Sequence, residues 1–212
     1  VLALNAKAEN FGISTTIDGE GKVMLPGLID AHGHLLGLGA NLLEVNLRES
    51  TSASNAAKMV SDYAFANKTQ SWITGRGWNQ ELWSDRAFPS ASDLDKVVSD
   101  RPVVLTRVDG HAAWVNTKAM EIAGITKDTQ SPVGGEIIKD ANGNPTGVFI
   151  DNASMLIEKH LPSASNAIYQ QQLDAAGEHL LANGITSMHD AGISRDVYDF
   201  YLKESVESDL PI

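Results

Sequence analysis

The chain has 212 residues, no cysteine, and 16 Lys and Arg against 27 Asp and Glu, which gives a formal net charge of −11. This length suffices for one sizeable domain with an apolar core, and 42% hydrophobic with 20% charged residues argues against disorder. Nucleic acid and anionic membranes are disfavoured as partners, because both require basic patches. The lack of cysteine excludes disulfide scaffolds, thiolate metal sites and cysteine nucleophiles.

The first third of the sequence predicts short strands followed by a helix. Apolar and polar residues alternate weakly at 13–17, which indicates a strand. A cluster of turn residues at 18–21 then leads to a second short strand at 22–24. After Pro26 and Gly27, the apolar run 28–31 is typical of a parallel strand buried on both faces. Apolar residues at helical spacing predict a helix at about 53–67, capped by Ser52.

The remainder predicts an alternation of strands and helices around an irregular, strand-containing middle. Strands are expected at 72–78 and 102–106, with a short helix near 93–98 between them, and a helix is expected from Ala112 to a left-handed cap at Gly124. The pattern at 135–150 is that of a hairpin. A helix at about 167–183, a strand at 185–188 and a helix near 195–206 follow. This order favours an α/β fold with a large insertion.

Two histidines stand at the end of the apolar run that begins at Leu28. His32 and His34 are two residues apart, so on a strand their side chains point to the same face. Both imidazoles can then approach one metal ion, at about 2.0–2.1 Å for zinc. The carboxyl end of a buried parallel strand is where α/β folds place their active sites. The alternative is two polar residues that are solvated or hydrogen-bonded at a strand end.

Four further residues are candidates for contacts with substrate or with the metal ligands. His111 follows a sharp turn, and it either donates a hydrogen bond to a substrate carbonyl oxygen or caps the next helix. His189 ends a predicted strand, and we favour a role in contacting the substrate or in orienting a metal ligand. Trp78, with Trp83, lies in the insertion and either walls an apolar pocket or packs in a core. Asp109 either orients a histidine or forms a turn.

Several blocks of the sequence resemble amidohydrolase family 3, the large-insert branch that includes N-substituted formamide deformylase-like enzymes. The run 25–34 is similar to the Pro-Gly-hydrophobic-hydrophobic-Asp-x-His-x-His motif of the amidohydrolase superfamily. The remaining blocks occur in the expected order, at residues 75–78, 107–116, 134–137 and 184–190. The likeness therefore covers nearly the whole chain.

The resemblance implies a fold and a domain organisation. It implies part of a (β/α)8 TIM barrel over 28–212, with an insertion at about 45–162, and a remnant of a small β-sandwich at 1–27. A closed barrel needs about 250 residues, so we expect this sequence to be a partial chain that includes two barrel strands. A partial barrel would expose strand edges and apolar helix faces, so self-association, for example as a homo-oligomer, is expected.

The resemblance also implies a chemistry, namely hydrolysis of a C–N bond of amide or formamide type by metal-activated water. The cofactor implied is a divalent metal, zinc being favoured, with one or two ions in the complete enzyme and with His32 and His34 as ligands. The family's remaining ligands and its catalytic aspartate would lie beyond Ile212, so no catalytic residue is assigned. With two ligands alone, the 212-residue species is expected to be inactive.

The partner implied is a small amide-like substrate, without nucleic acid or membrane. The alternative interpretation is a non-catalytic α/β fragment that binds a ligand or a partner through its insertion. The compartment stays open, with the cytoplasm favoured, because the natural N-terminus and any signal peptide are expected to lie upstream of Val1.

Overall fold

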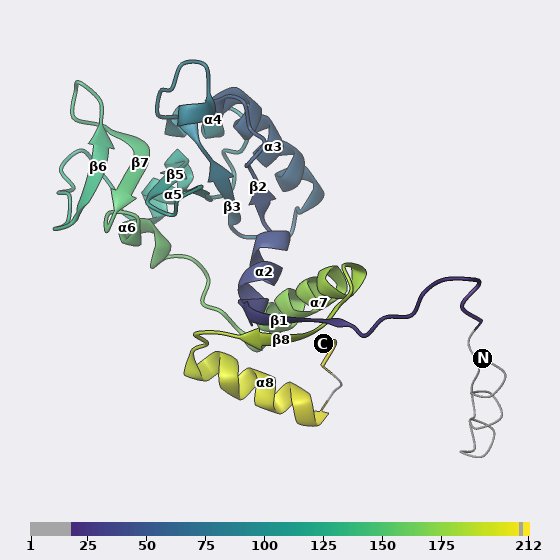
Figure 1. The fold of residues 1–212 in the computed structure, drawn as a ribbon. Coiled ribbons are helices and arrows are strands. Elements are labelled where there is room, and N and C mark those ends of the chain that lie inside the picture. Colours follow the sequence, from purple (N-terminus) through teal and green to yellow (C-terminus); the bar gives the residue numbers. More distant parts are fainter. Residues whose placement is uncertain (1–17, 208–209) are drawn as a thin grey trace, which may run out of the picture.

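The computed structural model describes residues 18–207 and 210–212, and these form an α/β fold with two groups of elements (Figure 1). The first group holds two strands, β1 and β8, and three helices around them. The second group is a six-stranded sheet with helices on both faces. The strand expected at 13–17 lies outside the described residues, and residues 22–27 form no strand.

The smaller group, which we name the histidine unit, joins elements from the two ends of the described chain. Its parts are β1 (Leu28–Gly33), α2 (Leu35–Leu42), α7 (Asn166–Ala182), β8 (Ile185–Asp190) and α8 (Arg195–Glu207). β1 and β8 pair in parallel, from Leu28 beside Ile185 to Gly33 beside Asp190. Because parallel strands need a crossover connection, α7 precedes β8 and returns the chain to β1.

Helices α2 and α7 pack closely because one glycine allows their backbones to approach. A Cβ on Gly39 of α2 would lie 1.9 Å from the carbonyl oxygen of Gln172 on α7, so no larger residue fits there without a shift. The small core of the histidine unit lies at this contact and includes Leu36, Leu173 and Phe200. Helix α2 begins directly after His34. The packing of α2 on α7 therefore also helps to position His34.

The larger group, which we name the six-stranded lobe, is a mixed sheet in the order β2-β3-β4-β5-β7-β6. Its strands are β2 (Val45–Asn46), β3 (Ile73–Trp78), β4 (Val103–Arg107), β5 (Ala112–Val115), β6 (Gly135–Lys139) and β7 (Pro145–Asp151). Its helices are α3 (Ala53–Ala66), the 3-10 turn η1 (Gln80–Leu82), α4 (Ala91–Asp95), α5 (Thr117–Ile122) and α6 (Met155–Glu158). Strands β2, β3 and β4 are parallel, and the others pair antiparallel.

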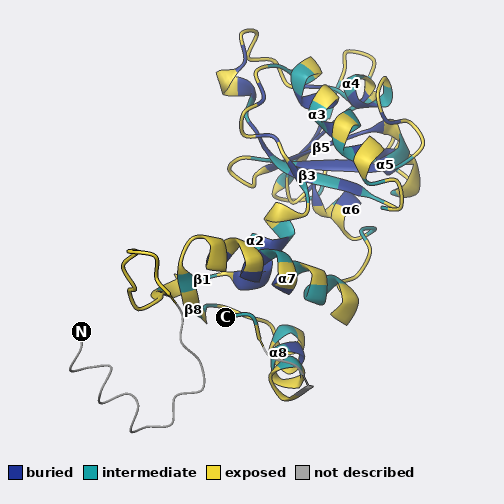
Figure 2. Ribbon diagram, turned by 90° about the vertical axis from the view of Figure 1, so that its right-hand side faces the viewer, coloured by how far each residue is buried: buried dark blue, intermediate teal, exposed yellow. Residues whose placement is uncertain are grey.

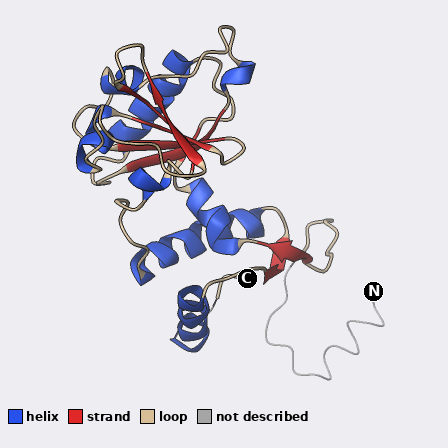
Figure 3. Cartoon of the chain, turned by 90° about the vertical axis from the view of Figure 1, so that its left-hand side faces the viewer, coloured by secondary structure: helices blue, strands red, loops and turns tan. Residues whose placement is uncertain are grey.

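Two cores separate this sheet from its helices (Figures 2 and 3). On one face, α3 buries Val60 and its alanines against β2, β3 and β4. On the other face, α5 and α6 bury Met120 and Ile157 against Phe149 of β7. These cores hold most of the fully buried side chains of the described chain, so the lobe is a three-layer structure.

Besides the strand expected at 22–24, which does not form, two further expectations from the sequence were wrong. The segment from Ala112 is strand β5, not helix, because its four residues are buried between β4 and β7 and complete their backbone pairing there; the helix begins only at Thr117. The run at 28–31 is a parallel strand, as predicted, but it is not buried on both faces. Leu28 and Ile29 are 62% and 64% exposed, because β8 is the one strand that pairs with β1 within the described residues.

Candidate metal and substrate site

His32 and His34 are brought together at the carboxyl end of β1. Their ring centroids lie 5.7 Å apart with an interplanar angle of 83°, and both residues are exposed. Asp30 shapes the backbone directly before them, because its Oδ1 accepts a hydrogen bond from the backbone N–H of His32 at 3.0 Å. The two imidazoles are thus presented to solvent from one strand end.

The hydrogen bond of His34 determines which of its ring nitrogens is free. Its Nδ1 lies 2.8 Å from the carbonyl oxygen of Ala191, the residue after β8. A carbonyl oxygen can only accept, so Nδ1 carries a proton, and in the neutral imidazole Nε2 then keeps its lone pair. Histidine ligands of metals usually have this arrangement, in which the second nitrogen donates to a carbonyl or carboxylate. The donor set therefore fits two positions of a divalent metal site.

In the part of the chain that the structure describes, no third ligand lies beside this pair. Among residues 18–207 and 210–212, no group of three or more His, Asp or Glu side chains is placed to hold a metal ion. Asp190 is engaged elsewhere, because its Oδ2 accepts from the hydroxyl of Tyr201 at 2.8 Å. Burial and this bond to Asp190 raise the pKa of Tyr201, so the phenol keeps its proton.

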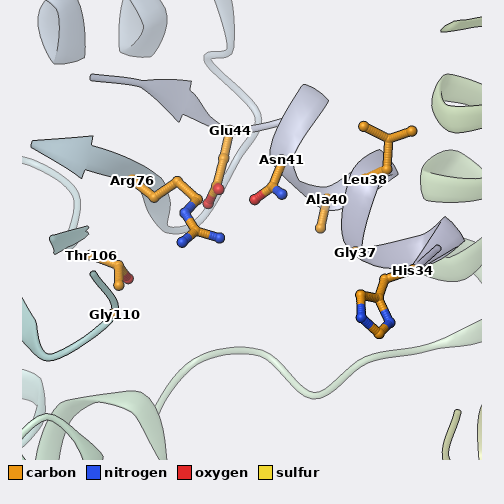
Figure 4. A pocket seen from close by; sticks show the side chains of 9 residues that line it. All are labelled: His34, Gly37, Leu38, Ala40, Asn41, Glu44, Arg76, Thr106 and Gly110. Atoms are coloured by element: carbon orange, nitrogen blue, oxygen red, sulfur yellow. The ribbon is translucent and has the colours of Figure 1, made fainter. Parts of the chain in front are cut away.

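An open cavity of about 690 Å³ begins at His34 and extends to the six-stranded lobe (Figure 4). Its lining comes from α2 and the residues beside it and from the ends of β3 and β4: His34, Gly37, Leu38, Ala40, Asn41, Glu44, Arg76, Thr106 and Gly110. This volume lies in the range of small-molecule sites. The carboxyl ends of β1, β3 and β4 all contribute to it, as expected for ligand sites in α/β folds.

His111 lies directly after Gly110 of the cavity lining and forms a pair with Asp151. Its Nδ1 is 2.8 Å from Oδ1 of Asp151, and the two side chains are 68% and 48% exposed. Asp151 has a positive φ of 47°, an uncommon backbone conformation for a residue other than glycine. His111 lies at the end of the turn that joins β4 to β5, so it does not cap a helix.

Asp109 forms the turn before His111. Its carboxylate accepts two hydrogen bonds from Arg107, at 2.9 and 2.8 Å, and one from the backbone N–H of His111 at 3.0 Å. The Arg107 hydrogen bonds hold the pKa of Asp109 below its ordinary value. Asp109 thus fixes the backbone of the turn, while Asp151 holds the imidazole of His111.

Trp78 and His189 differ in their surroundings. Trp78 is fully buried, lies against Trp83 and Trp114 with ring centroids 6.2 Å away from each, and donates its Nε1–H to the carbonyl oxygen of Leu105. Its surroundings are those of a core residue rather than a pocket wall. His189 is exposed on β8 and follows Met188.

Glu44 and Arg76 line the cavity, and reasoning from the sequence did not single them out. Burial raises the pKa of Glu44, and the positive charge of Arg76 opposes that shift. The signal that could have identified Arg76 is its position between two glycines, Gly75 and Gly77, at the end of a predicted strand. A charged side chain there has no ordinary structural role in a buried sheet.

Comparison with known proteins places the chain in a family. The sequence model of the amidohydrolase family matches residues 15–212. Putative amidohydrolase YtcJ of Bacillus subtilis is 36% identical over 88% of this chain and 36% of its own length. Protein LONG AFTER FAR-RED 3 of Arabidopsis thaliana is 39% identical over 82% of the chain and 30% of its own length. N-substituted formamide deformylase of Arthrobacter pascens is 26% identical over 92% of this chain and 37% of its own length.

Solved structures agree with this assignment at the level of the fold. An uncharacterized metal-dependent hydrolase of Pyrococcus horikoshii aligns over 99% of this chain and 40% of its own, with a TM-score of 0.73 and 23% identity. The chain spans about a third of the length of the curated relatives it matches. Among the described residues, no helix has both the length and the apolar character to cross a membrane. The chain belongs to the amidohydrolase family, in the branch called amidohydrolase family 3.

Proposed function

We propose that this chain supplies the first two metal ligands and part of the substrate cavity of an enzyme that hydrolyses a C–N bond of amide or formamide type. The observation that carries the proposal is the placement of His34. Its Nδ1 is committed to the carbonyl oxygen of Ala191, its Nε2 is free, and the same residue lines the 690 Å³ cavity. The name of the deformylase relative supports the bond type, as a C–N bond of a formamide.

We also propose that β1 and β8 are neighbouring strands of a (β/α)8 barrel. Their parallel pairing through the crossover helix α7 supports this, as does the alignment with the metal-dependent hydrolase over nearly the whole chain. On this proposal residues 45–162 are an insertion, and the six strands of the lobe all fall inside it. Residues 1–27 are proposed to belong to a separate small β-sandwich.

In the proposed mechanism, His32 and His34 hold a divalent ion, with zinc as the proposed identity. Such an ion, when bound, would supply a Lewis acid and would lower the pKa of a bound water to about 7. Ala191 keeps His34 in the tautomer whose Nε2 lone pair faces outward. Catalytic zinc sites usually have three protein ligands, so we expect the 212-residue chain alone to be inactive.

His111 is proposed to contact the scissile group. Its Nδ1 is hydrogen-bonded to Oδ1 of Asp151, which orients the ring and leaves Nε2 as the nitrogen proposed to donate to a substrate carbonyl oxygen. Its neighbour Gly110 lines the cavity, which supports this role. His189, exposed on the strand beside β1, is proposed to contact the substrate or to orient a ligand.

The test uses the complete gene product and a panel of simple amides and N-substituted formamides. We expect hydrolysis of at least one class, loss of that activity on stringent chelation, and recovery on adding zinc. His34→Ala should lower kcat/KM by at least about 100-fold, because it removes a ligand from the ion that activates water. His179→Ala, which changes an exposed histidine on α7, serves as the control. Full activity after stringent chelation would refute the proposal.

A further inference from the structure

Arg76 is half-buried, and within the described residues its guanidinium has no hydrogen-bond acceptor, although its charge acts on the nearby Glu44. Its Nε is inaccessible to solvent and makes no hydrogen bond, and no carboxylate oxygen lies within ion-pair distance of it. A buried donor left without an acceptor is costly, so such groups usually have a ligand or a structural partner. Arg76 therefore differs from an ordinary structural arginine.

Two other arginines of the same lobe show what a structural role requires. Arg101 donates from its terminal nitrogens to the backbone carbonyl oxygens of Ala64, Asn67 and Gln70. Its Nε, like that of Arg76, makes no hydrogen bond, but it lies 3.5 Å from the carboxylate of Asp100. Arg107 makes its paired hydrogen bonds with Asp109. Both have side chains less than 20% exposed, and both have acceptors for their guanidinium groups. Arg76, which lines the cavity, is the one of these three whose guanidinium has no hydrogen-bond acceptor among the described residues.

The cavity that Arg76 faces is the one that begins at His34. In Figure 4 the guanidinium of Arg76 and the carboxyl group of Glu44 are turned toward each other at one side, and the imidazole of His34 lies at the other. The amide of Asn41 and the hydroxyl of Thr106 add neutral polar groups to the lining. A small molecule in this cavity can thus reach the metal-binding histidine and the arginine together.

We propose that Arg76 binds a carboxylate on the substrate, so that the enzyme acts on amides that carry a carboxylate away from the bond it breaks. The proposal rests on the proposed function. A guanidinium presents its N–H donors in a planar fork that matches the two oxygens of a carboxylate. The neutral polar groups beside it can complete the hydrogen bonds of such a ligand without competing for it.

The protonation state of Glu44 affects how well this end of the cavity can bind the carboxylate of a ligand. Its burial raises its pKa, which favours the neutral carboxyl group, whereas the charge of Arg76 acts in the opposite direction. In the neutral form its O–H can donate to the ligand carboxylate. In the charged form it would repel that ligand. Replacing Glu44 by glutamine removes the repulsion and keeps a donor, so carboxylate binding should not weaken.

The experiment measures binding by titration calorimetry on the complete gene product, before and after removal of metal. The probes are N-formylglycine and its uncharged counterpart N-formylglycinamide. We expect the wild-type protein to bind the carboxylate at least about tenfold more tightly than the carboxamide, in both metal states. Arg76→Met should remove that preference, Arg76→Lys should keep part of it, and Glu44→Gln should keep it in full. Arg48→Met, which removes an exposed arginine outside the cavity lining, should behave as wild type.

Each result has a definite meaning. Equal binding of the two probes by the wild-type protein, or no binding of either, overturns the inference and requires no variant to fold. A preference that survives in Arg76→Met also overturns it and assigns the carboxylate to another group. If the preference is present and depends on Arg76 but no amide is hydrolysed, the proposed function fails and the carboxylate site stands. If amides are hydrolysed without any such preference, only the present inference fails.

Discussion

The six-stranded lobe and the histidine unit differ in how fully they bury their own side chains. In the lobe, three tryptophans are at most 2% exposed, and each indole N–H donates to a backbone carbonyl oxygen. In the histidine unit, the two strands pair only with each other within the described residues, and the apolar residues at the start of β1 are more than 60% exposed. The well-packed region contributes one wall of the cavity, while the less buried region carries His32 and His34.

This difference indicates that the residues that contribute most to stability and the proposed metal ligands lie in separate parts of the chain. The lobe holds Arg76 at a fixed position because β3 is paired on both sides. The histidine unit depends on the contact between α2 and α7 for its order. Substitutions in the two regions should therefore produce different combinations of stability loss and loss of function.

The largest effect is expected from Trp114→Ala in the lobe. Trp114 is fully buried between Trp78 and Trp83 and donates to the carbonyl oxygen of Ser90. Its truncation leaves a cavity and should lower the free energy of unfolding by about 3–5 kcal/mol. Urea unfolding followed by far-UV circular dichroism measures this. Phe65→Ala, at a residue that is 75% exposed, is the control, and equal effects of the two substitutions would contradict the comparison.

A smaller effect, confined to the histidine unit, is expected from Gly39→Ala. The added methyl group would meet the backbone of Gln172, so α2 must move away from α7 at a cost of about 1–3 kcal/mol. Because α2 begins directly after His34, metal affinity should fall together with stability. Gly37→Ala, whose nearest neighbour would be Cβ of His34 at 3.4 Å, should be neutral or slightly stabilising. Gly39→Ala with unchanged metal affinity would show that α2 does not position His34.

The smallest effect concerns the turn at Asp109. Hydrogen bonds from Arg107 lower the folded-state pKa of Asp109 below 3.8, so its ionised form stabilises the folded protein above that pH. This contribution is lost as the pH falls through the lowered pKa. Because the side chain is 43% exposed, solvent screening keeps the effect below about 1 kcal/mol. Asp109→Asn should unfold at lower urea concentration at pH 7, and the difference from wild type should vanish near pH 2. A difference that grows on acidification would reverse the assigned sign.

Much of the fold was predictable because local patterns and tertiary structure agree. The helix expected at about 53–67 is α3, and Ser52 caps it by accepting from the backbone N–H of Asn55. The hairpin at 135–150 and the helix before Gly184 also occur as predicted. The strand at Ala112–Val115 was not predictable from propensity, since alanine favours helices and only the pairing with β4 and β7 makes it a strand.

The candidate site was predictable only in part. His32 and His34 are two residues apart in the sequence, so their proximity follows from the period of a strand. Arg76, Glu44 and Gly110 come from segments that are distant in the sequence, and only the packing of α2 beside the lobe brings them around one cavity. The roles of Asp151 and Ala191 as hydrogen-bond partners of histidines were likewise invisible without the fold.

The central claim is that His32 and His34 together bind a divalent ion. It is tested most directly by titrating zinc into the metal-free complete gene product and measuring the dissociation constant by calorimetry. Wild type and His179→Ala should bind with equal affinity, whereas the His32→Ala/His34→Ala double variant should lose at least about 100-fold in affinity while retaining its far-UV circular dichroism spectrum. A folded double variant that binds zinc as tightly as wild type would contradict the account.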